Sequence, residues 1–442
     1  MWLILLLALA LRLPHMTSSL WLDESIQALA LMGKMGPLLE YALADFQPPL
    51  YHFILSAWTS LAGFSEFALR TPSLLAGLGT VYFATRLGEI ISNKKVGATL
   101  GLLVATNPLL IYYSAEGRTY MMTTFFVTAS FYYLFSLLKS KKSSPHLPIY
   151  YSLYTILALW SSYLAWIIIF LQLAYLVSQK KWQLVRLTSL AFLSLVPWIP
   201  SFIGSLGIGL STMNNSPEWG RVVGGISAKA IALTWVKSAI GRISFVSQYL
   251  YAGITIFLAG LHALILRRVK GKFTLLILSI IGTILIASLI SLVVPVYAYF
   301  RLLFLTPLFL TLLALGLTKL PRSVTTLVIL LNLAFIFVFY LSPTFHHEEW
   351  RTLTHDLNSQ EGVVAMPSLA QNAPLIYYQL ALPLTEIKNG ETLITPTLHY
   401  IRYVEDLFDP HLRGKASLNN QGYSRVDTQY YSGIVLEKYE TQ

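Results

Sequence analysis

The chain has 442 residues, of which 55% are hydrophobic and only 12% are charged. Soluble domains carry about 25% charged residues, so this composition excludes an ordinary soluble protein and predicts one that crosses a membrane several times. The net charge of +11 comes from short clusters between apolar runs, which is typical of cytoplasmic loops and not of a basic groove for nucleic acid. Because there is no cysteine, disulfides and thiolate metal sites are excluded.

Apolar runs of about 20 residues are long enough to span a bilayer. The sequence predicts 11 of them, at residues 1–15, 71–92, 96–113, 119–138, 149–163, 164–178, 187–207, 246–266, 273–295, 300–317 and 323–342. The first lacks a basic start and a small-residue cleavage site, so we expect a retained helix and not a signal peptide. The predicted fold class is therefore a polytopic α-helical membrane protein.

Five clusters of basic residues separate the predicted spans and hold 14 of the 31 basic residues. They are Lys94 and Lys95; Lys139, Lys141 and Lys142; Lys180, Lys181 and Arg186; Arg267, Arg268, Lys270 and Lys272; and Lys319 and Arg322. The positive-inside rule places all five in the cytoplasm only if residues 48–64 do not cross the membrane. We therefore expect a juxtamembrane or re-entrant helix there, opened by Pro48-Pro49, with an ordinary span as the alternative.

With a cytoplasmic N-terminus, residues 16–70, 114–118, 208–245, 295–301 and everything after 342 lie on the opposite side, which we call the predicted outer face. Residues 226–245, with Lys229, Lys237 and Arg242 among apolar residues, are predicted to form an interfacial helix on this face. This arrangement predicts a multi-pass protein of the plasma or inner membrane.

Acidic residues are rare before residue 343 and fall mostly on the predicted outer face. Only eight occur there, and Glu89 alone lies on the cytoplasmic side. Asp23 and Glu24 follow the first span directly, and carboxylates at a membrane boundary are costly unless they act there. They are the leading candidates for a catalytic base. The alternative is that they are favourable first-turn residues of a surface helix.

After Pro343 the pattern changes to that of a small soluble domain. A helix is predicted over 347–358, with Trp350, Leu353 and Leu357 on one face, and a strand over 363–366. A helix over 373–380 and a strand pair at 424–429 and 433–439 follow. The predicted domains are thus a membrane domain over 1–342, with an outer loop at 16–70, and an extracytoplasmic α/β domain over 343–442.

Two further groups of polar residues accompany Asp23-Glu24 on the predicted outer face. One is Tyr112 to Tyr120, which contains Glu116 and Arg118, and the other is Tyr297 to Arg301. An arginine at a membrane boundary suits an anionic phosphate headgroup, because guanidinium can bind phosphate oxygens in pairs. For Arg118 a structural pair with Glu116 is an equal alternative. His52 is a lone histidine of the kind that is usually structural.

These motifs, in this order, resemble the GT-C membrane glycosyltransferases, in particular the branch of the protein O-mannosyltransferases and the lipid A aminoarabinose transferase. The matching residues are Trp21-x-Asp23-Glu24, Pro48-Pro49-Leu50-Tyr51, Ser65-Glu66 with Arg70-x-Pro72-Ser73, Tyr113-Ser114-x-Glu116-x-Arg118-x-Tyr120, Phe300-Arg301-x-Leu303 with Pro307, and Glu349-Trp350-Arg351.

The resemblance implies transfer of a sugar from a polyprenyl-phosphate donor to an extracytoplasmic acceptor, a protein, lipid or cell-envelope glycan, by inverting single displacement. It places the catalytic carboxylate on Asp23, supported by Glu24. It implies that the donor or its phosphate is bound by Arg118, Arg301, Tyr120 and Glu116. It also implies that the acceptor or the loop is positioned by Gln47, Tyr51 and Arg70.

Two departures from the family pattern leave the donor sugar and metal use open. Gln47 stands where relatives often have a basic residue, and Tyr120 where some have an aspartate. The resemblance implies no definite cofactor and leaves a divalent metal as an option. The competing hypothesis is a transporter, flippase or polymer ligase of lipid-linked sugars. A transporter would place ionisable groups near mid-bilayer in repeated halves, which this sequence does not show.

Overall fold

The computed structural model describes residues 1–139, 144–215, 225–245, 247–271, 273–387, 395–409 and 411–441. Lys141, Lys142 and Lys272 of the predicted cytoplasmic clusters lie outside these residues. The chain forms two compact units: the first is Met1–Met16 with Leu39–Leu341, and the second is Thr17–Leu38 with Ser342–Gln442. The loop that carries Asp23 and Glu24, which we expected in the membrane domain, therefore groups with the C-terminal residues.

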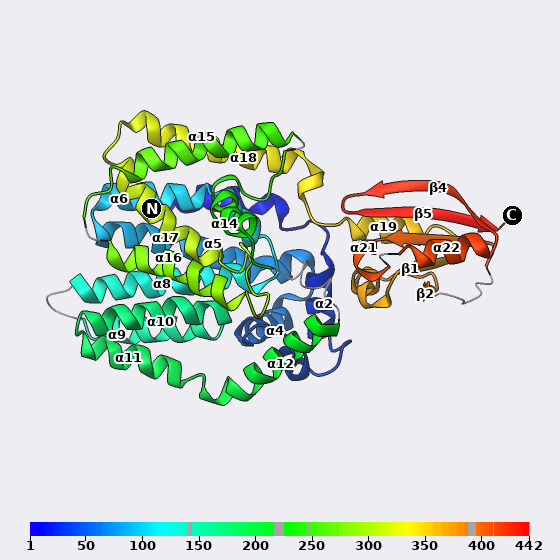
Figure 1. Cartoon of the computed structure of the whole chain (residues 1–442), viewed down its shortest axis with the longest axis horizontal. Helices are drawn as coiled ribbons and strands as arrows, with labels where there is room; N and C mark the ends of the chain where they lie inside the picture. The colour runs from blue at the N-terminus through cyan, green and yellow to red at the C-terminus, as the bar shows by residue number, and fades with distance from the viewer. Residues whose placement is uncertain are drawn as a thin grey trace. The chain divides into compact units, whose positions relative to one another are not determined.

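Within its described residues, the first unit consists of helices joined by loops and contains no strand (Figure 1). Its helices are α1 (Trp2–Ala10), η1 (Leu13–His15), α3 (Leu38–Ala44), α4 (Leu50–Ala62), α5 (Glu66–Ile91), α6 (Lys94–Ala105), α7 (Pro108–Ser114), α8 (Thr119–Lys139), α9 (His146–Leu159), α10 (Tyr163–Ser178), α11 (Trp182–Leu193), η2 (Val196–Trp198), α12 (Ile199–Asn215), α14 (Ala228–Ile240), α15 (Gln248–Leu266), α16 (Thr274–Ile290), η3 (Leu303–Leu305), α17 (Thr306–Leu317) and α18 (Arg322–Leu341).

Every predicted span corresponds to apolar helix, but the count of 11 is not confirmed. Within the described residues, five helices are long and apolar enough to cross a membrane: α5, α8, the continuous stretch from α11 into α12, α15 and α18. A sixth is reached if α6 and α7, which meet at a 60° bend, count as one span. The segment predicted as juxtamembrane forms α4, whose 13 residues give a length of only about 20 Å.

Local sequence explains how the central helices begin and where the bend falls. Ser65 caps α5, where its hydroxyl accepts a hydrogen bond from the Ala68 N–H at 3.3 Å. At the bend, the Asn107 side chain accepts from the Leu110 N–H at 3.0 Å, and Pro108 starts α7 without needing a donor. Helix α5 packs against α6, α7 and α8, so both halves of the bent span contact α5.

The bend is stabilised by Arg12, which is fully buried. Breaking the helix leaves carbonyl groups at the end of α6 without their usual partners. Arg12 donates to the Ala105 carbonyl at 3.0 Å, to the Val104 carbonyl at 3.3 Å, and to Ser114 Oγ at 3.0 Å. One buried guanidinium thus joins both halves of the bent span.

The segment predicted as an interfacial helix forms α14, but its C-terminal half is buried. Val236 to Ile240 are buried, and the Asn107 amide donates to the Ser238 carbonyl at 2.8 Å. Gly241 follows with φ +86°, and a Cβ there would lie 2.7 Å from Pro108. The end of α14 is therefore packed against α7.

The second unit contains a mixed five-stranded sheet in the order β2-β1-β3-β5-β4 (Figure 1). Strand β1 pairs in parallel with β2 and β3, while β5 pairs antiparallel with β3 and β4. The elements are α2 (Leu22–Leu31), η4 (Pro343–Phe345), α19 (Trp350–Leu357), β1 (Val363–Met366), η5 (Leu369–Gln371), α20 (Ala373–Tyr377), β2 (Leu384–Glu386), β3 (Thr397–Arg402), α21 (Glu405–Phe408), α22 (Arg413–Asn420), β4 (Tyr423–Tyr431) and β5 (Ile434–Thr441).

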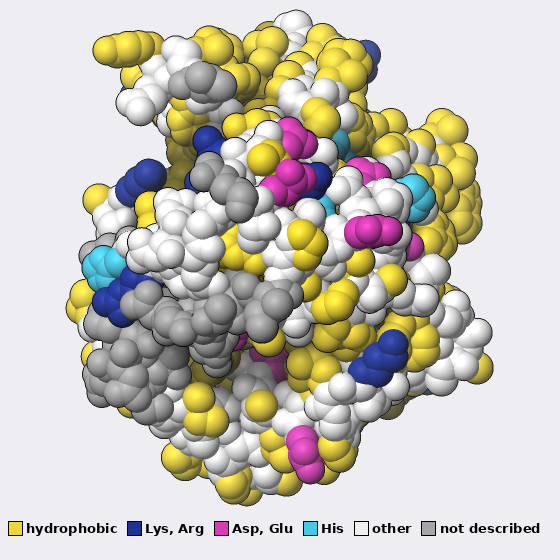
Figure 2. All heavy atoms as spheres, turned by 90° about the vertical axis from the view of Figure 1, so that its right-hand side faces the viewer, with side chains coloured by type: hydrophobic (Ala, Val, Ile, Leu, Met, Phe, Trp, Pro, Cys, Tyr) yellow, Lys and Arg dark blue, Asp and Glu magenta, His cyan; other side chains and the backbone are white. Residues whose placement is uncertain are grey.

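The sheet has a hydrophobic cluster on each face. On one face Trp350, Leu353 and Leu357 of α19, all fully buried as their spacing predicts, pack on Val364 and Leu436. On the other face Leu418 of α22 belongs to a separate cluster. The predicted helix 347–358, strand 363–366 and terminal strand pair are all present. Figure 2 shows one side of the molecular surface. Several acidic side chains lie there beside basic side chains and histidines, so charges of both signs are mixed.

Candidate active site

Asp23 and Glu24 lie in the first turn of α2, at the second and third positions after the Trp21 cap. Leu22 packs on the α19 cluster, and α2 packs against α20. The Leu20 N–H donates to the Tyr378 hydroxyl at 2.8 Å, and Arg351 Nη2 donates to the Thr17 carbonyl at 2.6 Å. These contacts hold the short segment before Asp23 in place within the second unit.

The surroundings of Asp23 include an acidic residue that sequence reasoning missed. Burial raises the pKa of the Tyr403 phenol, and the negative charges of Glu348 and Asp23 raise it further. The Tyr403 hydroxyl donates to Glu348 Oε1 at 3.1 Å. Trp21 stacks on His347, with 4.8 Å between ring centroids and 5° between ring planes. Asp23 thus lies near a phenol and a second carboxylate, while Glu24 is almost fully buried.

In the first unit, Glu116 and Arg118 lie on the loop between α7 and α8. The Arg118 N–H donates to the Glu116 carbonyl at 2.8 Å, and the hydroxyl of Ser73 on α5 donates to the Arg118 carbonyl at 3.3 Å. Glu116 is buried, whereas Arg118 is partly exposed. The motif containing Ser73 therefore holds the loop that carries Arg118.

Asp45 and His52 form a pair beside this loop. His52 Nε2 donates to Asp45 Oδ2 at 2.8 Å, across the Pro48-Pro49 turn. Burial alone would raise the pKa of Asp45, but the His52 hydrogen bond and the positive charge of Arg118 together lower it. The Asp45 carboxylate is therefore ionised, and the positive charge of Arg118 stabilises it. The sequence contained Asp45 among its few acids, but nothing in the spacing indicated the pairing.

The two tyrosine-rich motifs meet in the first unit. Tyr120 packs edge-to-face on Tyr113 at 5.6 Å and on Phe300 at 5.1 Å between ring centroids. Arg301 lies 5.8 Å from the Phe300 ring centroid, and its Nη1 donates to the Pro295 carbonyl at 3.2 Å. Motifs about 180 residues apart in sequence thus form one aromatic cluster that adjoins an arginine.

Arg242 is a third arginine in this region, and sequence reasoning gave it no site role. Its Nη1 donates to the Tyr112 hydroxyl at 2.7 Å, and the guanidinium lies 4.8 Å from the Tyr112 ring centroid. Burial disfavours its charge, but Tyr112, Tyr299 and Glu116 among others raise its pKa, so Arg242 stays cationic. The only sequence signal was a cation at the end of an amphipathic segment.

Lys237 fixes the turn that carries Arg242. Its ammonium donates to the carbonyls of Arg242 at 3.3 Å and Ile243 at 3.0 Å, and to Ser244 Oγ at 3.2 Å. Burial lowers the pKa of Lys237 to about 8, and the charge of Arg242 contributes to this shift. We interpret Lys237 as a positioning residue for Arg242.

The three residues predicted to position the acceptor or the loop have different surroundings. Arg70 is fully buried and donates from Nη1 to the His15 carbonyl at 3.2 Å, so it anchors the chain just before the Asp23 segment. Tyr51 is buried on α4. Gln47 precedes the two prolines, and its buried Oε1 has no hydrogen-bond partner among the described residues.

The nine predicted site residues therefore fall into the two units. Asp23 and Glu24 belong to the second, and Arg118, Arg301, Tyr120, Glu116, Gln47, Tyr51 and Arg70 to the first. A metal would need several clustered ligands. In the described part of the chain, no group of three or more His, Asp or Glu residues could hold a metal ion. We therefore assign no residues to a metal.

The fold and the ordered motifs define the class: the chain resembles the GT-C membrane glycosyltransferases, as its motifs predicted. The family model for dolichyl-phosphate-mannose-protein mannosyltransferases matches residues 46–203. This range contains the Pro48-Pro49 motif, the α6–α7 bend, and the Glu116 and Arg118 loop. A comparison with curated proteins finds no match.

Solved structures with a similar fold include ArnT from Cupriavidus metallidurans in the apo state, with a TM-score of 0.62 and 11% sequence identity. The match covers 99% of this chain and 97% of ArnT. The same enzyme bound to undecaprenyl phosphate matches with a TM-score of 0.60, 11% identity and the same coverage. The Archaeoglobus fulgidus oligosaccharyltransferase in complex with Zn and sulfate matches with a TM-score of 0.53 and 12% identity, over 88% of this chain and 62% of that one. At such identities these matches show a shared fold.

Proposed function

We propose that this protein is a membrane glycosyltransferase that moves a sugar from a polyprenyl-phosphate donor to an extracytoplasmic acceptor. The observation that carries the proposal is a set of three arginines in the first unit, two of them beside aromatic rings and the third on a loop bonded to α5. The Arg242 guanidinium bonds the Tyr112 hydroxyl, Arg301 adjoins Phe300, and Ser73 bonds the backbone carbonyl of Arg118. Cations fixed in this way suit a phosphate headgroup whose chain lies among apolar helices.

The likeness to ArnT supports the donor class. That enzyme has been crystallised with undecaprenyl phosphate, and its fold extends over nearly the whole of this chain. We propose that Arg118, Arg242 and Arg301 bind the donor phosphate, with Glu116 and Tyr120 shaping the same site. The buried Oε1 of Gln47 has no partner within the described residues. We propose that it accepts a hydrogen bond from the lipid-linked sugar or from the acceptor substrate.

Asp23 is proposed as the general base, and Glu24 as the residue that positions it. The acceptor hydroxyl attacks the anomeric carbon, and its proton passes to the Asp23 carboxylate. The bond between that carbon and the phosphate oxygen breaks, and polyprenyl phosphate leaves with the bonding electrons, stabilised by the arginines. One displacement inverts the anomeric configuration. No step passes through a metal.

For this chemistry the site must lie where a lipid-linked sugar is exposed. We propose a multi-pass protein of the plasma or inner membrane, with its N-terminus in the cytoplasm and the second unit outside. The experiment below distinguishes a hexose from a pentose, and a protein acceptor from a lipid or a glycan.

The test is mass spectrometry of cell-envelope glycans, glycolipids and glycoproteins from cells with and without the gene. We expect loss of one defined sugar modification, which returns when the wild-type gene is restored and stays absent with Asp23→Asn. Accumulation of untransferred lipid-linked donor should accompany the loss. An envelope identical in all strains, or full restoration by Asp23→Asn, would contradict the proposal.

A further inference from the structure

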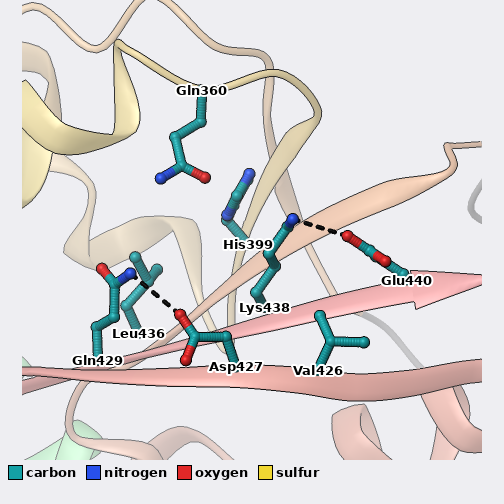
Figure 3. A pocket seen from close by; sticks show the side chains of 8 residues that line it. All are labelled: Gln360, His399, Val426, Asp427, Gln429, Leu436, Lys438 and Glu440. Atoms are coloured by element: carbon teal, nitrogen blue, oxygen red, sulfur yellow. Dashed lines mark hydrogen bonds and ion pairs between the residues drawn. The ribbon is translucent and has the colours of Figure 1, made fainter.

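The second unit contains a polar pocket of about 410 Å³ on one face of its sheet (Figure 3). This volume lies within the range of about 300–1,000 Å³ that is typical of ligand-binding pockets. Its floor is one row of residues that lie directly opposite each other on three strands: His399 on β3, Lys438 on β5 and Asp427 on β4. Gln360, in the loop after α19, lies across from this row.

A β-bulge places Asp427 on this face. Neighbouring residues of a strand normally point to opposite faces. The register of β4 shifts between Arg425 and Asp427, so that Asp427 pairs with Lys438 although Arg425 pairs with Tyr439. Both Val426 and Asp427 therefore line the pocket. Bulges redirect side chains in this way and are common beside binding sites.

The polar groups of the pocket combine donors and acceptors. Lys438 Nζ donates to Glu440 Oε1 at 2.7 Å, and Gln429 Nε2 donates to Asp427 Oδ2 at 3.1 Å. Asp427 Oδ1 also accepts from the Thr428 N–H at 2.8 Å. Because an ammonium has three donors and a carboxylate about four acceptor positions, these contacts leave hydrogen-bonding capacity on Lys438 and Asp427. His399 Nε2 donates to the Glu361 carbonyl at 3.0 Å, so the other ring nitrogen is the acceptor of the neutral ring.

This chemistry favours a ligand with many hydroxyl groups, since each hydroxyl both donates and accepts. Two carboxylates, of Asp427 and Glu440, face one ammonium, of Lys438, so a phosphate or other anion would be repelled. A peptide that added a strand would pair with an edge strand such as β4 and not bind the face of the sheet. We propose that this pocket binds a neutral sugar, as a carbohydrate-binding site separate from the proposed transfer chemistry.

The experiment measures sugar binding to the full chain in phospholipid nanodiscs, because sugar-headed detergents would compete. Cellobiose, lactose and methyl α-mannoside are titrated separately, without any lipid donor, and followed by saturation-transfer NMR and calorimetry. We expect saturable binding of at least one of them. Asp427→Asn and Lys438→Met should each weaken it about tenfold, through loss of hydrogen bonds to a charged group.

Tyr430→Phe is the matched control, because Tyr430 lies on the same strand but outside the pocket and is exposed. Its affinity for the sugar should equal that of the wild type, and thermal unfolding checks the fold of every variant. If Asp427→Asn or Lys438→Met fails to fold, Gln360→Ala replaces it, because Gln360 lines the pocket from a loop and its loss should also weaken sugar binding. Absence of binding by all three sugars, equal binding in all variants, or binding of extended peptides instead would overturn the proposal. Loss of glycosyl transfer in other variants would leave this result unaffected.

Discussion

Arg12 and Ser114 lie 102 residues apart in sequence and are joined by a hydrogen bond of 3.0 Å between Nε and Oγ in the interior of the first unit. The same guanidinium bonds the two carbonyls at the end of α6. The bent span and the loop that follows it, which carries Glu116 and Arg118, therefore depend on a residue near the start of the chain. Gly77 on α5 makes room for this contact, since a Cβ there would lie 2.3 Å from Ser114 Oγ.

We predict that Arg12→Met destabilises the protein by about 2 kcal/mol or more, because buried acceptors left without donors cost about 1–3 kcal/mol each. Gly77→Ala should also destabilise it, through displacement of Ser114. The matched control is Gly253→Ala on α15, where a Cβ meets nothing within 4 Å. Thermal unfolding in detergent is the measurement. Equal melting temperatures for Gly77→Ala and Gly253→Ala would contradict the role of this contact.

Arg301 supports a prediction about donor binding. A guanidinium has five N–H donors, and the one that bonds the Pro295 carbonyl fixes its orientation beside Phe300. Hydrogen bonds to charged groups contribute about 1.5–3 kcal/mol, so Arg301→Ala should weaken donor binding about tenfold or more. Lys229→Ala, on the exposed start of α14, is the control and should bind normally. Equal affinity of both variants for a purified polyprenyl-phosphate sugar would remove Arg301 from the site.

The lowered pKa of Lys237 predicts that protein stability and donor affinity change in opposite directions with pH. Its pKa is about 8 in the folded protein and 10.5 in the unfolded chain. Between these values the unfolded chain binds more protons, so stability should rise with pH across this window. The ammonium that fixes the Arg242 turn is lost in the same window, so donor affinity should fall as pH rises through about 8. Binding and thermal unfolding measured from pH 7 to 10 test both signs, and Lys237→Met should flatten both profiles. Parallel changes in affinity and stability would rule out this role.

The membrane topology can be tested by cysteine labelling, because the native chain has no cysteine. Single cysteines at Lys270, between α15 and α16, and at Glu349, at the cap of α19, are predicted to face opposite sides of the membrane. Only the cysteine at Glu349 should react with an impermeant reagent added outside intact cells. Labelling of Lys270→Cys from outside would overturn the predicted sidedness, and with it the proposed location of the site.

The sequence predicted the local elements well where a single pattern decided them. Trp350, Leu353 and Leu357 marked α19, and Val363 to Met366 are β1 as predicted. Strands β2 and β3 were missed because one has only three residues and the other mixes polar and apolar residues without alternation. Both strands exist because the sheet provides their partners, and the local sequence does not show those partners.

The site was less predictable, because it depends on contacts between distant residues. The likeness of the motifs predicted Arg118 and Tyr120 as site residues and included Phe300, but it did not show that Arg242 would bond Tyr112 from 130 residues away. Nor did it show that the Asp23 segment packs within the second unit, where Arg351 bonds Thr17 across 334 positions. In the sequence, Arg12 is a single cation after an apolar run, and nothing there indicates that it bonds the carbonyls of Val104 and Ala105.

The strongest prediction concerns Asp23. It lies at the second position of α2, where a negative charge near the helix N-terminus contributes about 0.3–1 kcal/mol, and Asp23→Asn removes this charge while keeping the shape of the side chain. If Asp23 is only structural, this variant should be folded and nearly active. If it is the general base, the variant should be folded while sugar transfer falls about a hundredfold or more, the usual contribution of such a group. Glu24→Gln should lower transfer less, since Glu24 is proposed only to position Asp23.

The measurement is transfer from a purified polyprenyl-phosphate sugar, with thermal unfolding recorded on the same sample. Glu40→Gln is the matched control, because Glu40 is an exposed acid in the first turn of the following helix, α3, and has no proposed role. Donor affinity of Asp23→Asn should be unchanged, since the arginines of the first unit are proposed to bind the phosphate. Near-normal transfer by Asp23→Asn, or an equal loss in Glu40→Gln, would refute Asp23 as the base.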